Sequence, residues 1–310
     1  MAISVTVIDE YKNFGRCIKV SNGTVEMLAT VDVGPRIIRF GFVGGKNIMF
    51  NDIDRKHITH IDSMDEYYYE GASWYNYGGH RLWSSPEALP RTYCPDNDAV
   101  EYEIIERGMI LMPKPQTKNG IAFTMKAEMA DDGRLTVTHY VKNISNEDKT
   151  MSAWAVSVLD RGGVEIIPNN TEDTGLLANR RIVAWSYTDL SDERAYFGRD
   201  FITLRQKDGK NGAFKLGLDN HSGVAMYLLG DLLFVNRYVH DKSAEYEDYG
   251  CSFETYTGDD FLELETLGAK TLTHPGDVIS HVETWELHKV NEPINERDDD
   301  SIHSVLDRFM

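Results

Sequence analysis

FLELETL at residues 261–267 and HVETWEL at residues 281–287 decide the fold. In both stretches apolar or aromatic side chains alternate with polar ones, which is typical of β-strands that bury one face. LTVTHYV at residues 135–141 has the same period of two. Between such runs lie turn signals rich in Gly, Asn, Asp and Pro, at residues 21–23, 44–46, 131–133, 208–210, 220–223 and 274–276. The body of the chain shows no long helical periodicity, so the sequence predicts a large antiparallel all-β sandwich.

The chain has 310 residues, with no interior stretch typical of a linker and no clear repeat. We therefore expect a single β-domain over residues 1–290. Residues 291–310 differ, because the polar stretch NEPINERDDD precedes SIHSVLDRFM. There Ile302, Val305, Leu306 and Phe309 form an amphipathic stripe, which predicts a short helix capped by Asp300 or Ser301. Docking on the body is preferred to a role in binding a partner.

The composition is acidic, with 32 Lys and Arg against 50 Asp and Glu and a net charge of −18. No basic stripe is present, so we expect neither a nucleic acid nor a membrane as partner. No secretory signal or membrane-length apolar run is found. The odd number of cysteines (Cys17, Cys94 and Cys251) argues against a disulfide framework and favours the cytoplasm.

The window WYNYGGHRLWSSPEALPRTYCPDN, residues 74–97, combines aromatic rings, a histidine, two arginines and a Gly pair. Aromatic faces beside guanidinium and imidazole groups suit a sugar, which has apolar C–H faces and hydroxyl edges. An aromatic-rich connection that covers the edge of a core would have the same composition. The sequence alone leaves both interpretations open.

Two glutamates of FLELETL, Glu263 and Glu265, lie two residues apart and are expected on one face of a strand. Among apolar neighbours, a carboxylate needs a partner or its pKa rises, and either state suits a general base. A structural ion pair would look the same. A metal site using His80, His240 and a carboxylate lacks HxH, HExxH or paired-Cys spacing, so we expect no metal. Nucleophile-elbow and dinucleotide motifs are also missing, and no cofactor is expected.

At these residues the chain resembles the galactose mutarotase-like (aldose 1-epimerase) superfamily, and within it a GGH-containing branch. Four landmarks occur in the family's order: VDVGPRIIRFGF (31–42), GGHRLW (78–83), NISNEDKTMSAWAVSVL (143–159), and LELETLG with HPGDVISHVETWEL (262–268 and 274–287). The resemblance spans roughly residues 5–290. It implies an antiparallel β-supersandwich of about thirty strands with a hexose-binding cleft on a concave face.

The resemblance also implies a mechanism. A glutamate takes the proton of the anomeric hydroxyl while a histidine protonates the ring oxygen, so that the ring opens and closes on its other face. Glu265 matches the base and Arg81 a substrate-binding arginine. The family histidine has no counterpart, because the matching strand reads Ser152-Ala153-Trp154-Ala155. His80 is the preferred replacement, because the Gly pair would hold it near Arg81.

Other residues complete the expected site. His139 and His240 are alternative acids, and we expect Trp83, Trp154, His240 and Glu263 to contact the sugar. The leading hypothesis is an aldose 1-epimerase acting on a sugar or short glycan, and the alternative is a non-catalytic carbohydrate-binding or sensing domain. Lyase or hydrolase chemistry ranks last, because hydrolysis needs carboxylates on opposite sides of a bond. A phosphorylated sugar would need a cluster of arginines, drawn from Arg36, Arg39, Arg81 and Arg91.

Overall fold

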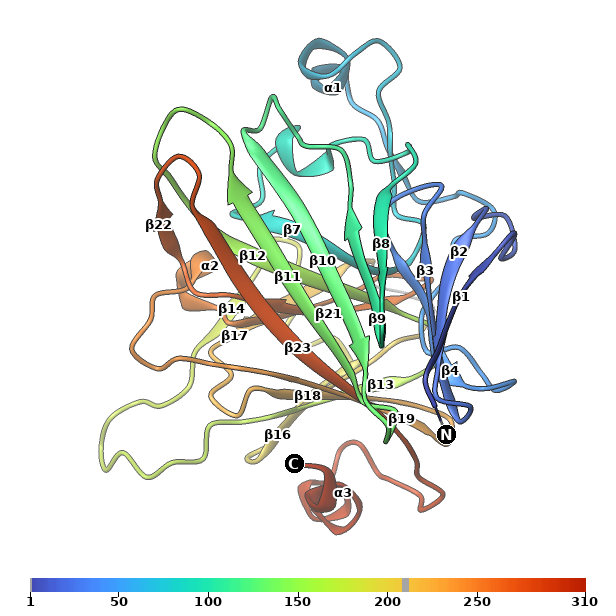
Figure 1. Ribbon diagram of the computed structural model, residues 1–310. Helices are drawn as coiled ribbons and strands as arrows, with labels where there is room; N and C mark the ends of the chain where they lie inside the picture. Colours follow the sequence, from blue (N-terminus) through green and yellow to red (C-terminus); the bar gives the residue numbers. More distant parts are fainter. Residues whose placement is uncertain (1, 208–211) are drawn as a thin grey trace.

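The computed structural model describes residues 2–207 and 212–310, which form two large antiparallel sheets and one small one (Figure 1). The first sheet has, in spatial order, β1 (Ser4–Ile8), β2 (Cys17–Ser21), β3 (Val25–Thr30), β4 (Ile37–Phe42), β7 (Gly79–Ser85), β12 (Lys149–Leu159), β21 (Leu262–Leu267), β20 (Phe253–Thr257), β17 (Phe214–Leu218) and β14 (Ile182–Ala184), with β22 (Thr271–Thr273) paired to β12. The second has β15 (Ala195–Phe197), β16 (Phe201–Arg205), β13 (Val164–Pro168), β18 (Val224–Leu229), β19 (Leu232–Tyr238), β23 (Val278–Lys289), β11 (Leu135–Asn143), β10 (Ile121–Met129), β9 (Gly108–Met112) and β8 (Glu101–Ile105). The small sheet pairs β5 (Ile58–Thr59) with β6 (Trp74–Tyr75).

The predicted all-β fold is confirmed, and the three alternating stretches lie in β11, β21 and β23. Burial alternates residue by residue along β10 and most of β11, as expected for strands with one face in the core. β12 differs, because both of its faces are buried from residue 151 onward. The turn expected at residues 208–210 lies outside the described residues.

The main core lies between the two large sheets, which Figure 1 shows stacked with β10, β11 and β23 in front of β7, β12 and β21. Phe40 of β4 exemplifies the contact, since its ring centroid lies 6.1 Å from that of Phe234 on β19 and 5.6 Å from that of Trp285 on β23. Aromatic pairs at such distances stabilise the packing beyond the area they bury.

The described residues form three short α-helices, α1 (Asp62–Tyr67), α2 (Glu247–Gly250) and α3 (Asp299–Leu306), and 3-10 turns at Arg91–Tyr93 and Asp307–Phe309. The predicted C-terminal helix is confirmed as α3. Its residues Ile302, Val305 and Leu306 are buried against β13, β16, β18 and β19. The predicted cap is wrong, because Asp298 accepts the N–H groups of Asp300 and Ser301.

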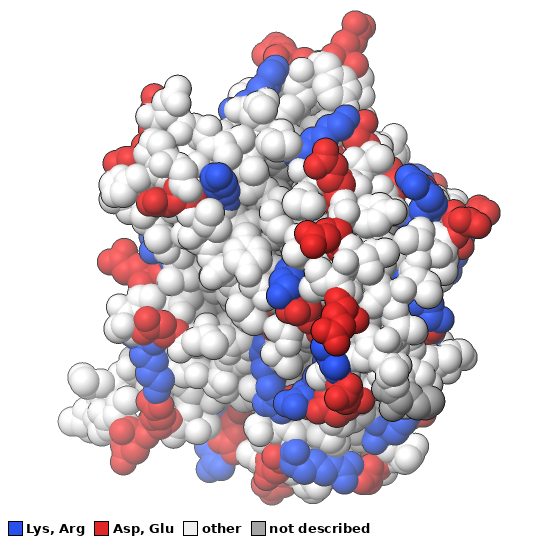
Figure 2. Space-filling view, viewed as in Figure 1, with Lys and Arg blue, Asp and Glu red and all other residues white. Residues whose placement is uncertain are grey.

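On the face shown in Figure 2, acidic and basic side chains are interspersed and no continuous basic stripe appears. Within the described part of the chain, no helix has the length and apolar character needed to span a membrane.

Candidate functional site

The register of the first sheet brings distant charged residues onto one face. Arg81 on β7 pairs with Val156 on β12, which pairs with Glu265 on β21, which pairs with Glu254 on β20. Directly opposed residues in antiparallel strands point to the same side, so this row shares a face. One flanking row on that face contains Trp83 and Trp154. The row on the other side contains Glu263, Tyr256 and Lys215.

A cleft of about 300 Å³ lies over this face. Arg81, Trp83, Lys215 and Glu263 line it from the sheet. Loops contribute aromatic and polar side chains: His57, Tyr93, Tyr187 and Phe261. The cleft therefore combines charged groups with ring faces, as small-molecule sites commonly do.

Arg81 and Glu263 form the ion pair at the surface of the cleft. Arg81 Nη2 donates to Glu263 Oε1 at 3.0 Å, and the guanidinium carbon lies 4.0 Å from the centroid of the Trp83 ring. Arg81 Nε and Nη1 have no hydrogen-bond partner among the described residues. The Glu263 side chain is 13% exposed, so a ligand in the cleft meets this carboxylate directly.

Lys215 at the floor of the cleft lies between two buried carboxylates. Its Nζ is 2.7 Å from Glu254 Oε2 and 3.1 Å from Glu265 Oε2, and Trp154 Nε1 donates to the same Glu265 oxygen at 2.8 Å. Burial raises the pKa of Glu265, although Lys215 opposes the rise, and the pKa of Glu254 is raised well above its usual value for the same reason. Burial by itself lowers the pKa of Lys215, but the two carboxylates raise it by more, so that the pKa lies above its usual value. Burial therefore favours the protonated form of each carboxyl, whereas the nearby ammonium favours the charged form.

Comparison with known proteins identifies the fold. No protein-family model and no curated protein matches the sequence. Among solved structures, a galactose mutarotase-like protein from Lactobacillus casei superposes with a TM-score of 0.56 at 11% identity, over 88% of this chain and 100% of that one. The fold is galactose mutarotase-like. A TPR-domain containing protein from Parabacteroides distasonis superposes with a TM-score of 0.60 at 14% identity over 90% of this chain, which spans only 48% of that protein.

Within this mutarotase-like fold, the described residues form twenty-three strands rather than the roughly thirty that the resemblance implied. Most of the GGHRLW segment lies in a strand, because residues 79–83 belong to β7. Arg81, Trp83, Trp154, Glu263 and Glu265 do come together around the cleft, with Glu265 beneath its surface.

The placement expected for His80 is wrong. Neighbouring residues of a strand point to opposite faces, so Arg81 faces the cleft and His80 faces the core between the sheets. His80 is fully buried, with Nδ1 2.9 Å from Ser157 Oγ and Nε2 2.7 Å from His139 Nε2. Burial lowers its pKa well below the usual value. The His80 ring therefore lies on the opposite face of the sheet from the cleft and cannot contact a ligand bound there.

The two alternative histidines also lie elsewhere. His139 on β11 is buried beside His80, and burial lowers its pKa to about 3. His240 follows β19 and contacts Asp219 and His221, and neither it nor His139 lines the cleft. The histidine that does line it is His57, whose Nε2 lies 3.2 Å from Asp260 Oδ2.

The sequence reasoning missed His57, Lys215 and Glu254. Glu254 and Lys215 come from neighbouring strands, and FKLGL at residues 214–218 carried a signal, a lysine inside an otherwise apolar strand. His57 has no such signal, because it precedes a strand of only two residues. The four arginines proposed for a phosphate are not gathered in the cleft: Arg36 pairs with Asp96 and Arg39 with Glu26, and of the four only Arg81 lines it.

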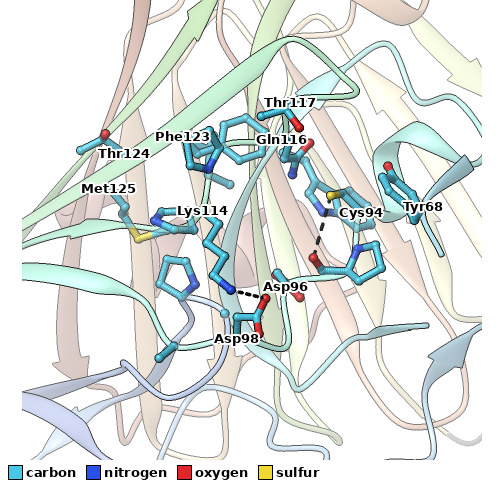
Figure 3. A pocket seen from close by; sticks show the side chains of 18 of the residues that line it. Tyr68, Cys94, Asp96, Asp98, Lys114, Gln116, Thr117, Phe123, Thr124 and Met125 are labelled. Atoms are coloured by element: carbon cyan, nitrogen blue, oxygen red, sulfur yellow. Dashed lines mark hydrogen bonds and ion pairs between the residues drawn. The ribbon is translucent and has the colours of Figure 1, made fainter. Parts of the chain in front are cut away.

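Trp83 also lines a second cavity, of about 260 Å³ (Figure 3). Its walls include Leu82, Phe123 and Met125 and several prolines, and Lys114 pairs with Asp98 at 2.9 Å. Arg36 and Asp96, which form an ion pair at 2.6 Å, also line this cavity, whereas the buried carboxylates Glu254 and Glu265 and the ammonium of Lys215 lie together at the cleft. The cleft is therefore the better candidate for the functional site.

Proposed function

We propose that the cleft binds a hexose or short glycan and that the protein is an aldose 1-epimerase. The observation that carries the proposal is the Arg81–Glu263 pair at the surface of the cleft, above Glu265 and beside Trp83. A guanidinium and a carboxylate can bind adjacent sugar hydroxyls, while the ring faces contact C–H groups. The mutarotase-like fold supports the same function, and the GGH at residues 78–80 supports assignment to the GGH-containing branch.

In this proposal Glu265 is the general base, as the resemblance implies. Glu265 Oε2 is held by Trp154 and Lys215, whereas Oε1 has no hydrogen-bond partner among the described residues. Oε1 would take the proton of the anomeric hydroxyl after the ligand displaces side chains above it. Glu263 is the competing candidate, because its carboxylate already faces the cleft.

We assign the general acid to His57 in place of His80. His57 lines the cleft, and the Asp260 carboxylate orients its ring. A proton from His57 to the ring oxygen, with loss of the anomeric proton to the base, breaks the C1–O bond and gives the open aldehyde. Rotation about C1–C2 and reversal of both transfers closes the ring as the other anomer.

Polarimetry of freshly dissolved α-glucose and α-galactose tests the activity. We expect the wild-type protein to accelerate mutarotation, and Glu265→Gln and His57→Gln to lower its rate constant by about 10²–10⁴-fold. Glu263→Gln distinguishes Glu263 from Glu265 as the general base. If Glu265 is the base, this variant should weaken sugar binding more than it lowers the turnover rate. A wild-type rate equal to that of buffer refutes the epimerase proposal.

A second function is favoured by one observation. The strand in which the family has its histidine reads Ser152-Ala153-Trp154-Ala155 here, and the indole N–H of Trp154 donates to Glu265. Such an arrangement fits a non-catalytic carbohydrate-binding or sensing domain that kept the cleft. Saturable sugar binding without accelerated mutarotation, lost in Trp83→Ala, would select this function over the enzyme.

A further inference from the structure

A cluster of two histidines and one aspartate lies away from the cleft. Asp219 and His221 belong to the turn between β17 and β18, and His240 follows the end of β19. The pairing of Val224 with Arg237 in the β18–β19 hairpin brings this turn beside residue 240. One ligating atom from each of the three side chains lies within 4.8 Å of the other two.

The distances in this cluster match those between ligands of one ion. Asp219 Oδ2 is 3.3 Å from His221 Nε2, and Asp219 Oδ1 is 3.5 Å from His240 Nε2. Charge-assisted hydrogen bonds are shorter, at about 2.7–2.9 Å. Tetrahedral ligands about 2.0–2.1 Å from an ion are about 3.3–3.4 Å apart. Two imidazole nitrogens therefore approach one carboxylate at the spacing of metal ligands.

His240 supplies a second, independent observation. Its side chain is only 2% exposed, its Nδ1 has no hydrogen-bond partner within the described part of the chain, and its Nε2 lies 3.5 Å from Asp219 Oδ1. The ring is stacked on His221 and on Tyr246, each with ring centroids 5.0 Å apart. Burial of an imidazole without close polar partners is costly, and an ion between Nε2 and Asp219 would replace the long 3.5 Å contact with two metal–ligand bonds.

Other charged groups face the cluster. Arg181 Nη1 lies 3.5 Å from Asp219 Oδ2 and also donates to the carbonyl oxygen of Gly250. This cation competes with a metal ion for the carboxylate. The side chains of Asp219 and His221 are 19% and 23% exposed, so water and ions reach the cluster from solvent.

We propose that Asp219, His221 and His240 form a binding site for a divalent transition-metal ion such as Zn²⁺, with water completing its coordination. Two histidines and a carboxylate are a common ligand set for this class of ion. The ion would connect the β17–β18 turn to the end of β19. The proposal is independent of the sugar cleft, so either can fail without the other.

Titration of the EDTA-treated full chain with Co²⁺ and Zn²⁺ tests the site. We expect one Co²⁺ per chain, with the intense visible absorption of a low-coordinate ion, displacement of Co²⁺ by Zn²⁺, and a higher melting temperature with Zn²⁺. His240→Phe preserves the ring stacking and removes the nitrogens, and it should weaken binding at least about tenfold. Asp219→Asn should do the same if His240→Phe fails to fold. Arg181→Gln should tighten binding by removing the competing cation.

His274→Phe is the matched control, because His274 is exposed and pairs with Asp148 at 2.8 Å but belongs to no group of three metal-ligating side chains among the described residues. This variant should bind Co²⁺ as the wild type does. The proposal is overturned if the wild type shows no saturable binding, or if His240→Phe and Asp219→Asn bind as tightly as the wild type.

Discussion

Replacement of Lys215 by methionine tests the electrostatics beneath the cleft. The ammonium is the cation between Glu254 and Glu265, at 2.7 and 3.1 Å, and its side chain is 7% exposed. Methionine has a similar length and packs against the rings of Trp154 and Trp185, over which the ammonium now lies. Lys215→Met therefore removes the charge with little loss of volume.

The expected destabilisation is about 3–5 kcal/mol, because removal of one partner leaves buried charge uncompensated. Its pH dependence has a definite sign. Burial already raises the pKa of both glutamates, and loss of Lys215 raises them further. At pH values between the pKa of these glutamates in the unfolded chain and their raised pKa in the folded protein, the folded state binds more protons than the unfolded state. The free energy of unfolding therefore falls as pH rises through this range. The variant should therefore lose more stability at about pH 8 than at about pH 5.

Urea denaturation followed by circular dichroism at both pH values measures the effect. Lys289→Met is the matched control, since Lys289 pairs with Asp231 at the surface and should contribute only about 0–1 kcal/mol. Adding Glu254→Gln to Lys215→Met should restore part of the stability. A loss no larger than that of Lys289→Met, or equal at both pH values, refutes the reasoning.

Three further predictions concern the core, the C-terminal helix and the cleft. His139 has a folded pKa of about 3 against 6.5 in its ordinary state, so its contribution to stability is lost as pH falls below 6.5; the difference in unfolding free energy between wild type and His139→Gln should shrink from about pH 7 to about pH 4. Asp298→Ala should cost about 0.5–2 kcal/mol by removing the cap of α3, and Ile302→Ala about 2–5 kcal/mol by leaving a cavity, both measured by denaturation; unchanged midpoints would show that α3 does not dock in solution. Trp83→Ala should weaken sugar binding by calorimetry, because Arg81 loses the ring on which it rests, and unchanged affinity would exclude Trp83 from the site.

Local patterns predicted strands such as β10 and β11 well, because these carry their own alternation of more and less buried residues. The strands at residues 135–141 and 281–287 could be predicted from their local sequence pattern alone. The helix stripe at Ile302, Val305 and Leu306 is also local. Its cap was misplaced by two or three residues, since Asp298, Asp299, Asp300 and Ser301 are all acceptable caps in sequence.

The site was predicted only in part, because it depends on pairing between distant strands. Arg81 and Glu263 are 182 residues apart, and only the β7–β12–β21 register brings them together. Because neighbouring residues of a strand point to opposite faces, His80 cannot face the cleft when Arg81 does. This could have been inferred from the sequence if GGHRLW had been assigned to a strand. Lys215 and His57 depend on the order of strands and on loop paths, which a single sequence does not specify.

A crystal of the protein soaked with a panel of monosaccharides tests the central claim most directly. We expect a hexose in the cleft, with hydroxyls bonded to Arg81 and Glu263, the anomeric hydroxyl toward Glu265 and the ring oxygen toward His57. A cleft that stays free of sugar at saturating concentrations, or a sugar bound only elsewhere on the protein, would contradict the account.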